Sequence, residues 1–308
     1  QRKMARDARD DKAGRPVIYN TNGVVVAELK VDEAATAGKI VRIYPAHDAQ
    51  PIENAGDGTE VAVICDVTAF HAEGGGQLGD IGTITAPTGV IEVTVTKKLP
   101  DGATIMVGNV IEGTVAVGEE VTFAVQSNRK NDIARNHTAT HLLHAALKQV
   151  LGSHVNQAGS YVGPDRLRFD FSHFSQVTEA ELKEVEAIVN EEILAGKDVA
   201  IEELPIEEAK KRGATALFGE KYGDVVRVVT VPEFSMEFCG GSHVSNTAQI
   251  GMFKIISEAS TGAGVRRIEA VTGHGAVEHV NATEAMVKGL AAELKCRVND
   301  VPARLEAL

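Results

Sequence analysis

One cysteine and three histidines of this chain form two pairs that share a spacing of four residues. His137 and His141 stand in RNHTATHLLH, and Cys239 and His243 stand in FCGGSHV. Thiolate and neutral imidazole are the ligands that zinc prefers, and one cysteine with three histidines completes a tetrahedron. The glycines between Cys239 and His243 let the backbone turn freely. The two pairs together predict a divalent-metal site.

The first pair depends on a helix for its geometry. On a helical wheel His137, His141 and His144 share one side, and neighbours four apart lie about 5–6 Å from each other at Cβ. The apolar residues that should pack on the domain share the opposite side: Ala139, Leu142, Leu143, Ala146, Leu147 and Val150. For His144 a solvated polar position is at least an equal alternative. Because HTATH lacks the glutamate of HExxH, the usual zinc-protease arrangement is excluded.

Composition limits the class of protein. A chain of 308 residues that is 44% hydrophobic has the length for about two or three domains with real cores. A net charge of −12 argues against an indiscriminate nucleic-acid coat, and the absence of tryptophan makes a stacking platform for single strands unexpected. Three scattered cysteines indicate a reducing compartment, and the sequence has neither a long apolar run nor a signal-peptide core. We expect a cytoplasmic protein that binds neither membranes nor DNA.

The first part of the chain is predicted to be rich in strands. Residues 1–16 resemble the end of a charged helix, and residues 17–128 predict a small β-barrel with a glycine-rich GGGQ loop. Turn residues separate the strand-like runs, which are 23–30, 39–45, 60–68, 89–97 and 119–126.

The second part mixes helices and strands. Within residues 129–275 we expect helices over 131–151 and 178–196, the latter opening with a capping box of Thr178 and Glu181. Strands are expected over 224–231, 252–259 and 264–273, and a helical arm over 276–308, where Val280, Val287 and Leu294 are seven apart. The predicted class is therefore α+β: a small N-terminal β-barrel, a mixed α+β domain and a C-terminal helical arm.

Several motifs carry a resemblance to a known family. HTATH followed about a hundred residues later by CGGSH resembles the editing domain of alanyl-tRNA synthetases, with related forms in stand-alone alanyl-tRNA editing proteins and threonyl-tRNA synthetases. Further blocks are similar and in the same order: AEGGGQLGDIG (72–82), RNHTATHLLHAAL (135–147), LRFDFSH (167–173), ALFGEKYGD (216–224) and GAGVRRIEAVTG (262–273). Departures are Ser242 in place of a common threonine, and His71 with a third glycine in the GGGQ segment.

The resemblance implies a function. The two ends of the chain resemble the flanks of the editing domain in the bacterial-type family, and no class II catalytic motif is evident. We therefore expect a monomeric fragment without the aminoacylation domain, whose residues 129–275 edit tRNA. It should hydrolyse seryl- and glycyl-tRNA(Ala) with one Zn²⁺ bound by His137, His141, Cys239 and His243. Zinc would activate water or anchor the substrate, and assistance from the terminal ribose hydroxyl is a further route.

The substrate pocket is expected around the first histidine pair. The Thr140 hydroxyl would bond a serine side chain, and an alanine substrate would lose that hydrogen bond; the alternative is a helix-surface threonine. By resemblance Gln157 and Ser160 match pocket positions. Gln77 would hold substrate or support the domain interface, or it belongs only to a hairpin turn. Asp170, which alternates with two phenylalanines, would support a histidine or lie on a polar strand face.

Basic residues suggest the route of the tRNA acceptor end. Arg266 and Arg267 would hold phosphate or pair with acids, and at least one should have a structural partner because neighbouring strand residues face opposite sides. The further candidates for this path are Arg129, Lys130, Arg135, Arg166 and Arg168, followed by Lys210, Lys211 and Arg212. Charged runs are more often solvated faces.

Three alternatives stay open. A zinc-stabilised module would bind tRNA without hydrolysis, and four protein ligands would favour it, whereas three ligands with an open position would favour catalysis. An inert scaffold would bind no zinc. A threonyl-type editor is disfavoured by the GGGQ barrel and the helical C-terminus.

Overall fold

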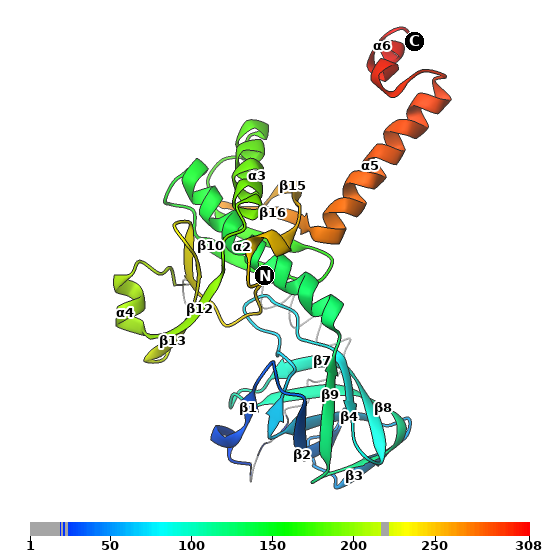
Figure 1. The fold of residues 1–308 in the computed structure, drawn as a ribbon, viewed down its shortest axis with the longest axis vertical. Coiled ribbons are helices and arrows are strands. Elements are labelled where there is room, and N and C mark those ends of the chain that lie inside the picture. The colour runs from blue at the N-terminus through cyan, green and yellow to red at the C-terminus, as the bar shows by residue number, and fades with distance from the viewer. Residues whose placement is uncertain (1–18, 20, 22–23, 217–221) are drawn as a thin grey trace. The chain divides into compact units, whose positions relative to one another are not determined.

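The computed structural model describes residues 19, 21, 24–216 and 222–308. The helix expected over residues 1–16 and most of the ALFGEKYGD block lie outside them. The chain forms two compact units: the first contains the residues up to Gly74 together with Leu78–Lys130, and the second contains Gly75–Gln77 together with Asn131–Leu308. Figure 1 shows the elements of both units.

The first unit is a closed antiparallel barrel, which confirms the predicted architecture. Its strands follow the order β8-β4-β2-β9-β6-β7, and β7 also pairs with β8, so the sheet closes on itself. Six strands form it: β2 (Ala37–Pro45), β4 (Glu60–Cys65), β6 (Gly82–Thr85), β7 (Gly89–Lys98), β8 (Thr104–Ala116) and β9 (Glu120–Val125). Short strands lie beside them: β3 (Asn54–Gly56) pairs with β8, and β1 (Lys30–Val31) pairs with β5 (Val67–Thr68).

The barrel differs from the prediction in several places, since the short strands β3 and β6 also had no predicted counterpart. The expected strand over 23–30 is wrong: its described part contains a 3₁₀ turn, η1 (Val26–Glu28), followed by the first residue of β1. Val25 is 58% exposed there. β-branched residues favour a strand only where their side chains can pack on one face of a sheet, and this segment has no such face. The longest strand, β8, had no counterpart in the prediction because Gly108 and Gly113 interrupt its apolar pattern. A Cβ at Gly108 would lie 1.9 Å from the carbonyl oxygen of Glu92, so the glycine permits this close approach.

Two basic residues at the C-terminal end of the first unit, Arg129 and Lys130, bind polar groups in loops of the same unit. Lys130 Nζ lies 2.8 Å from Asp80 and 2.9 Å from Glu33, and Arg129 donates to the carbonyl of Gly79. Burial raises the pKa of Glu33, but hydrogen bonds from His71 and Lys130 outweigh it and lower the pKa to about 2. The donors of Lys130 and Arg129 thus have partners inside this unit.

We expect Glu33→Gln to destabilise the first unit at neutral pH and to lose this effect in acid. A lowered carboxyl pKa stabilises the fold above the unfolded value near 4.5, and the contribution disappears as the pH falls toward about 2. Because the Glu33 side chain is 39% exposed, screening limits the effect to roughly 0.5–1 kcal/mol. Thermal unfolding measured by circular dichroism between about pH 7 and pH 2.5 tests this. Glu92→Gln, at an exposed glutamate with no ion pair to a described residue, is the control. A pH-independent deficit would contradict the prediction.

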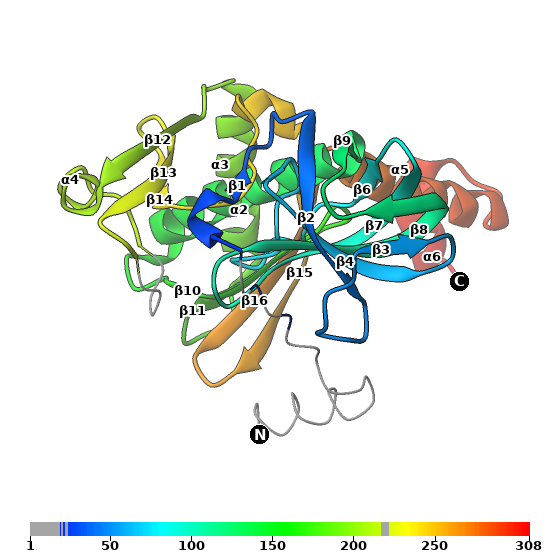
Figure 2. The same ribbon diagram turned by 90° about the horizontal axis from the view of Figure 1, so that it is seen from below.

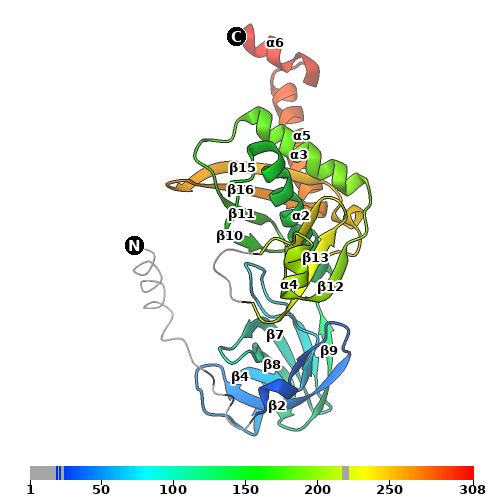
Figure 3. The same ribbon diagram turned by 90° about the vertical axis from the view of Figure 1, so that its left-hand side faces the viewer.

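The second unit is built on a four-stranded antiparallel sheet covered by two helices. The sheet order is β10-β11-β16-β15, with β10 (Gln157–Val162), β11 (Leu167–Ser172), β16 (Val265–Thr272) and β15 (Phe253–Gly262). Helices α2 (Ser127–Leu151) and α3 (Glu179–Leu194) lie on one of its faces (Figure 3). The predicted capping box of α3 is present, with Thr178 and Glu181 bonding each other's backbone. The core between helices and sheet contains Leu142, Leu143, Leu147, Phe169, Phe171, Val185, Val189 and Ile268.

A smaller sheet and a helical arm complete this unit. The sheet has the order β12-β13-β14, from β12 (Ala200–Pro205), β13 (Val225–Val231) and β14 (Ser235–Phe238), with helix α4 (Ile206–Lys211) after β12. The turn η2 (Thr247–Ile250) precedes β15, and Figure 2 shows the long β15–β16 hairpin. The arm consists of α5 (Gly273–Glu293), η3 (Val298–Asp300) and α6 (Val301–Glu306), which confirms the predicted C-terminal helix. None of the described helices is long and apolar enough to cross a membrane.

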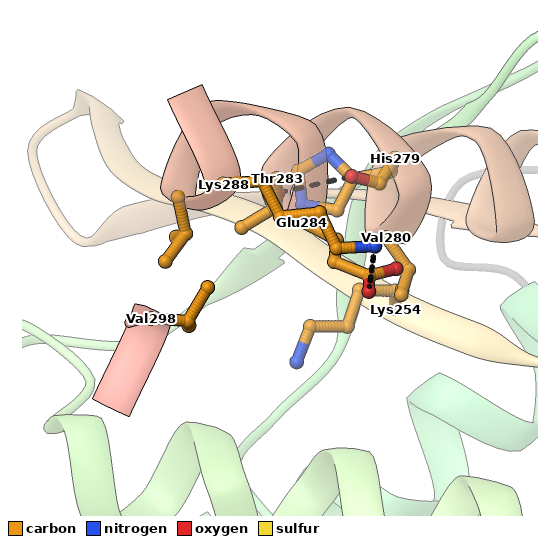
Figure 4. A pocket seen from close by; sticks show the side chains of 8 residues that line it. Lys254, His279, Val280, Thr283, Glu284, Lys288 and Val298 are labelled. Carbon is orange, nitrogen blue, oxygen red and sulfur yellow. Dashed lines mark hydrogen bonds and ion pairs between the residues drawn. The ribbon is translucent and has the colours of Figure 1, made fainter. Parts of the chain in front are cut away.

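A hollow runs along the arm, with a volume of about 540 Å³. Figure 4 shows side chains of α5, Lys254 of β15 and Val298 of η3 around it. It contains none of the four cysteine and histidine residues that the sequence singles out, nor any of the predicted pocket residues. This hollow is therefore separate from the predicted chemistry.

Candidate metal centre

The structure brings the two predicted ligand pairs together. Helix α2 carries His137 and His141 one turn apart, and the loop after β14 carries Cys239 and His243. One ligand atom from each residue lies within 4.8 Å of all the others. Cys239 Sγ is 3.4 Å from Nε2 of His137 and 3.2 Å from Nε2 of His243. Four donors from two distant segments thus converge on one point.

The spacing of these donors fits a zinc ion. Zinc binds sulfur at about 2.3 Å and imidazole nitrogen at about 2.0–2.1 Å, so a tetrahedral site holds sulfur and nitrogen about 3.5 Å apart. The measured separations of 3.4 and 3.2 Å agree with this requirement. His137 and His141 are 6% and 5% exposed, so the surroundings are also dry.

The outer nitrogen of His137 is held by the glycine-rich loop. Gln77 Oε1 accepts a hydrogen bond from Nδ1 of His137 at 2.6 Å and another from the Ser242 amide at 2.9 Å. The amide group of Gln77 is itself buried and donates to the Ser242 hydroxyl. Because Nδ1 of His137 donates to Gln77, Nε2 keeps the lone pair that a metal needs.

His243 is oriented by a residue of α2. The Thr138 hydroxyl donates to the carbonyl of Ala134, so its oxygen is an acceptor. Nδ1 of His243 donates to this oxygen at 3.1 Å, and the Val244 amide donates to it at 3.2 Å. Nε2 of His243 is therefore the nitrogen that faces the cysteine sulfur. Thr138 adjoins the histidine pair in sequence, yet nothing in HTATH distinguishes its role from that of Thr140.

The third histidine of the stripe is buried. His144 is 2% exposed, its Nδ1 lies 2.7 Å from Oε1 of Glu237, and its ring lies against Phe169. Oε2 of the same glutamate lies 3.5 Å from Nδ1 of His141, an ion-pair contact rather than a hydrogen bond. The solvated-face alternative for His144 is wrong, because both sides of α2 are covered by protein. Glu237 stands two residues before Cys239 on β14. Its position on a strand did not predict that its carboxylate would lie beside His141 and His144.

Electrostatics prepare the cluster for a cation. Burial raises the pKa of Cys239, but the neighbouring imidazoles, His137 first, outweigh it and hold the pKa well below its usual value. Burial and His137 together lower the pKa of His243 to about 3. Burial lowers the pKa of His141, yet Glu237 and Cys239 outweigh it and raise the pKa to about 9. The site offers a thiolate and a neutral imidazole, and the proton of His141 must leave when a metal binds, so metal affinity falls with falling pH.

The glycines of CGGSH differ from each other. Neither Gly240 nor Gly241 has a positive φ, so turning freedom is not their shared purpose. A Cβ on Gly241 would lie 2.1 Å from Cε1 of His137 and 2.6 Å from Oε1 of Gln77, whereas a Cβ on Gly240 would meet no atom within 4 Å. Arg227 fixes this loop by donating to the carbonyls of Cys239 and Gly241. Glycine is thus required at position 241 because the backbone there lies against the imidazole ring of His137.

Two of the predicted pocket residues, Gln157 and Ser160, lie on the face of the sheet that packs against α2. Gln157 pairs with Phe171 and Ser160 pairs with Phe169, because a bulge shifts the register between Gln157 and Gly159. Without the bulge, residues three apart on a strand would face opposite sides. Thr140 is 4% exposed, so it is not a surface threonine; its hydroxyl donates to a backbone carbonyl of α2 and leaves an oxygen lone pair.

The other predicted site residues have internal partners. Asp170 forms a two-bond pair with Arg267, and Arg266 forms one with Glu258. Both arginines therefore have structural partners, and the carboxylate of Asp170 is bonded to an arginine and not to a histidine of the described residues. Arg135 donates to Gln249 and Asp132.

Two arginines share one tyrosine. The guanidinium groups of Arg166 and Arg168 lie 5.6 and 5.0 Å from the centre of the Tyr161 ring. Arg166 also pairs with Asp165 at an exposed position, and Arg168 forms no ion pair with a described residue. Arg168 is therefore one of the basic residues of the predicted path that keep capacity for an external anion.

Two family descriptions match the chain. Residues 226–269 match "Threonyl and Alanyl tRNA synthetase second additional domain", and residues 3–129 match "tRNA synthetases class II (A)". The first interval contains Cys239 and His243, half of the converging ligand set. Fold, site and these matches define a protein of the class II tRNA synthetases.

Relatives of known name narrow the assignment. The chain is 49% identical to the alanine–tRNA ligase of Bacillus velezensis and 50% identical to that of Bacillus subtilis, over its whole length and 35% of theirs. It is 51% identical to the alanine–tRNA ligase of Acetivibrio thermocellus over 86% of the chain and 30% of that protein. The chain belongs to the alanyl-tRNA synthetase family, and it spans about a third of the length of the relatives it matches. The threonyl-type alternative is therefore wrong.

Proposed function

We propose that this chain is an editing hydrolase that removes serine or glycine from mischarged tRNA(Ala), with Zn²⁺ bound by His137, His141, Cys239 and His243. The observation that carries the proposal is the convergence of these four donors in a member of the alanyl-tRNA synthetase family. The hydrogen-bonded outer nitrogens of His137 and His243 support it, since ligands held in one tautomer are preorganised for metal.

The reaction is hydrolysis of the ester between the amino acid and the terminal ribose. A bound zinc ion supplies Lewis acidity toward an oxygen and an anchor for polar groups of the substrate. Thr140 accepts a hydrogen bond from the seryl hydroxyl, because its own proton is already committed to Asn136. Gln157 and Ser160 form the far wall on the inner face of β10. The tRNA acceptor end approaches along Arg166 and Arg168.

A second candidate rests on one observation. Four protein donors already complete a tetrahedron, which is typical of structural zinc sites. A zinc-stabilised module that binds the tRNA acceptor end without hydrolysing it is therefore the alternative. For either function we propose a monomer in the cytoplasm, which the three free cysteines support.

Deacylation of three charged tRNAs separates the two candidates. The zinc-loaded chain should release serine and glycine from tRNA(Ala) and leave Ala-tRNA(Ala) intact. Thr140→Val should lower kcat/KM for Ser-tRNA(Ala) roughly 5- to 150-fold. This factor corresponds to the loss of one hydrogen bond worth about 1–3 kcal/mol. Gly-tRNA(Ala), which has no hydroxyl, is the internal control and should change little. Hydrolysis no faster than in buffer, with tRNA still bound, would favour the binding module.

A further inference from the structure

We infer that Glu237 is a positioning residue of the metal centre, whose buried carboxylate holds His141 in its ligating tautomer, and that His144 holds this carboxylate in place. The inference rests on the proposed zinc site and goes beyond it by assigning two residues outside the ligand set. It also gives the third histidine of HTATHLLH a role.

One carboxylate reaches two successive turns of α2. Its Oε1 lies 2.7 Å from Nδ1 of His144, and its Oε2 lies 3.5 Å from Nδ1 of His141. An ionised carboxylate only accepts hydrogen bonds, so Nδ1 of His144 donates its proton to Oε1. Nδ1 of His141 is buried and has no hydrogen-bond partner among the described residues, so a proton there faces Oε2 of Glu237 across 3.5 Å. His141 is then left with Nε2 as its metal-binding atom, in the carboxylate–histidine–metal arrangement of well-ordered zinc sites.

Charge supports the same assignment. Glu237 is 8% exposed, and the imidazoles of His141 and His144 that face it are buried as well. A buried carboxylate needs compensation nearby, and imidazole N–H groups or a bound cation supply it. Arg227 is the nearby cation, but its donors bond the carbonyls of Cys239 and Gly241.

His144 itself is neither a ligand nor a proton donor to substrate. It is not among the four converging residues, and its Nε2 is buried with no hydrogen-bond partner in the described chain. A group without access to the site does not exchange protons there. What remains is its short bond to Glu237 and its packing on Phe169.

Zinc affinity tests the inference independently of catalysis. Competition with a chromophoric chelator should show Glu237→Gln binding Zn²⁺ about 10- to 100-fold more weakly than wild type, still at one ion per chain. His144→Ala should weaken binding similarly, and His144→Asn, whose amide donates near the Nδ1 position, should restore most of the affinity. The absorption of bound Co²⁺ reports whether the thiolate still ligates. Glu258→Gln, at a buried carboxylate paired with Arg266, is the matched control and should keep wild-type affinity.

The outcomes separate this inference from the proposed function. If the wild-type chain binds neither Zn²⁺ nor Co²⁺, the metal site fails and the inference fails with it. If wild type binds zinc and the folded Glu237→Gln protein binds it within about twofold, the metal site stands and the positioning role is overturned. Equal losses in His144→Asn and His144→Ala would also overturn it, since the donated hydrogen bond would then be irrelevant.

Discussion

Cys239→Ser is expected to remove the metal and, with it, the proposed deacylation of Ser-tRNA(Ala). Cysteine supplies the only thiolate of the cluster, and its sulfur lies within 3.4 Å of two ligand nitrogens. Structural zinc sites bind with about 10–16 kcal/mol, so losing one of four ligands costs on the order of 3 kcal/mol, or roughly 100-fold in affinity. Metal content by mass spectrometry and a deacylation time course measure the two effects.

The control for this variant is another free cysteine. Cys296, on the arm after α5, is outside the ligand cluster, so Cys296→Ser should leave metal content and activity at wild-type levels. A zinc affinity of Cys239→Ser equal to that of wild type, measured by chelator competition, would contradict the ligand assignment. Loss of zinc with unchanged deacylation would instead show that the metal is not needed for the reaction.

Gly241→Ala is expected to be nearly as damaging, although it removes no functional group. The added methyl would lie 2.1 Å from the ring of His137 and 2.6 Å from Gln77 Oε1, a separation that requires the ligand or the loop to shift. Overpacking of a tight site costs about 1–3 kcal/mol, and a displaced ligand adds a loss of roughly 100-fold in zinc affinity. Thermal unfolding with and without zinc, together with chelator competition, measures both parts.

The neighbouring glycine provides a matched control. Gly240→Ala places the same methyl where no atom lies within 4 Å, so stability should change by less than about 0.5 kcal/mol and zinc affinity should stay the same. Equal effects of the two substitutions would show that backbone freedom, and not space beside His137, explains this glycine pair.

Much of the fold could be predicted because its signals are local. The capping box at Thr178 and the apolar spacing of α3 lie within a few turns of one helix, and both are present. The barrel followed from short strand-like runs, but β8 did not, because its two glycines serve contacts with the neighbouring β7 and the turn before it. Residues 24–30 have strand propensity without a strand partner for most of their length, which only the assembled barrel reveals.

The sequence by itself singled out the four residues that converge in the structure. Two pairs of metal-binding residue types, each four residues apart, are a local feature, and their chemistry predicts a divalent-metal site that zinc suits. Motif order likewise indicated the family to which the chain belongs.

Only the tertiary structure decided how those ligands are held. Gln77 bonds His137 across 60 residues, and Glu237 bonds His144 across 93, distances over which sequence spacing predicts no contact. The bulge that brings Gln157 and Ser160 to one face is equally invisible in strand alternation. Helical and strand periods report which residues share an element, whereas the choice of partner for a buried nitrogen depends on which elements pack together. For this reason the four converging residues could be predicted from the chain, and the bond between His144 and Glu237 could not.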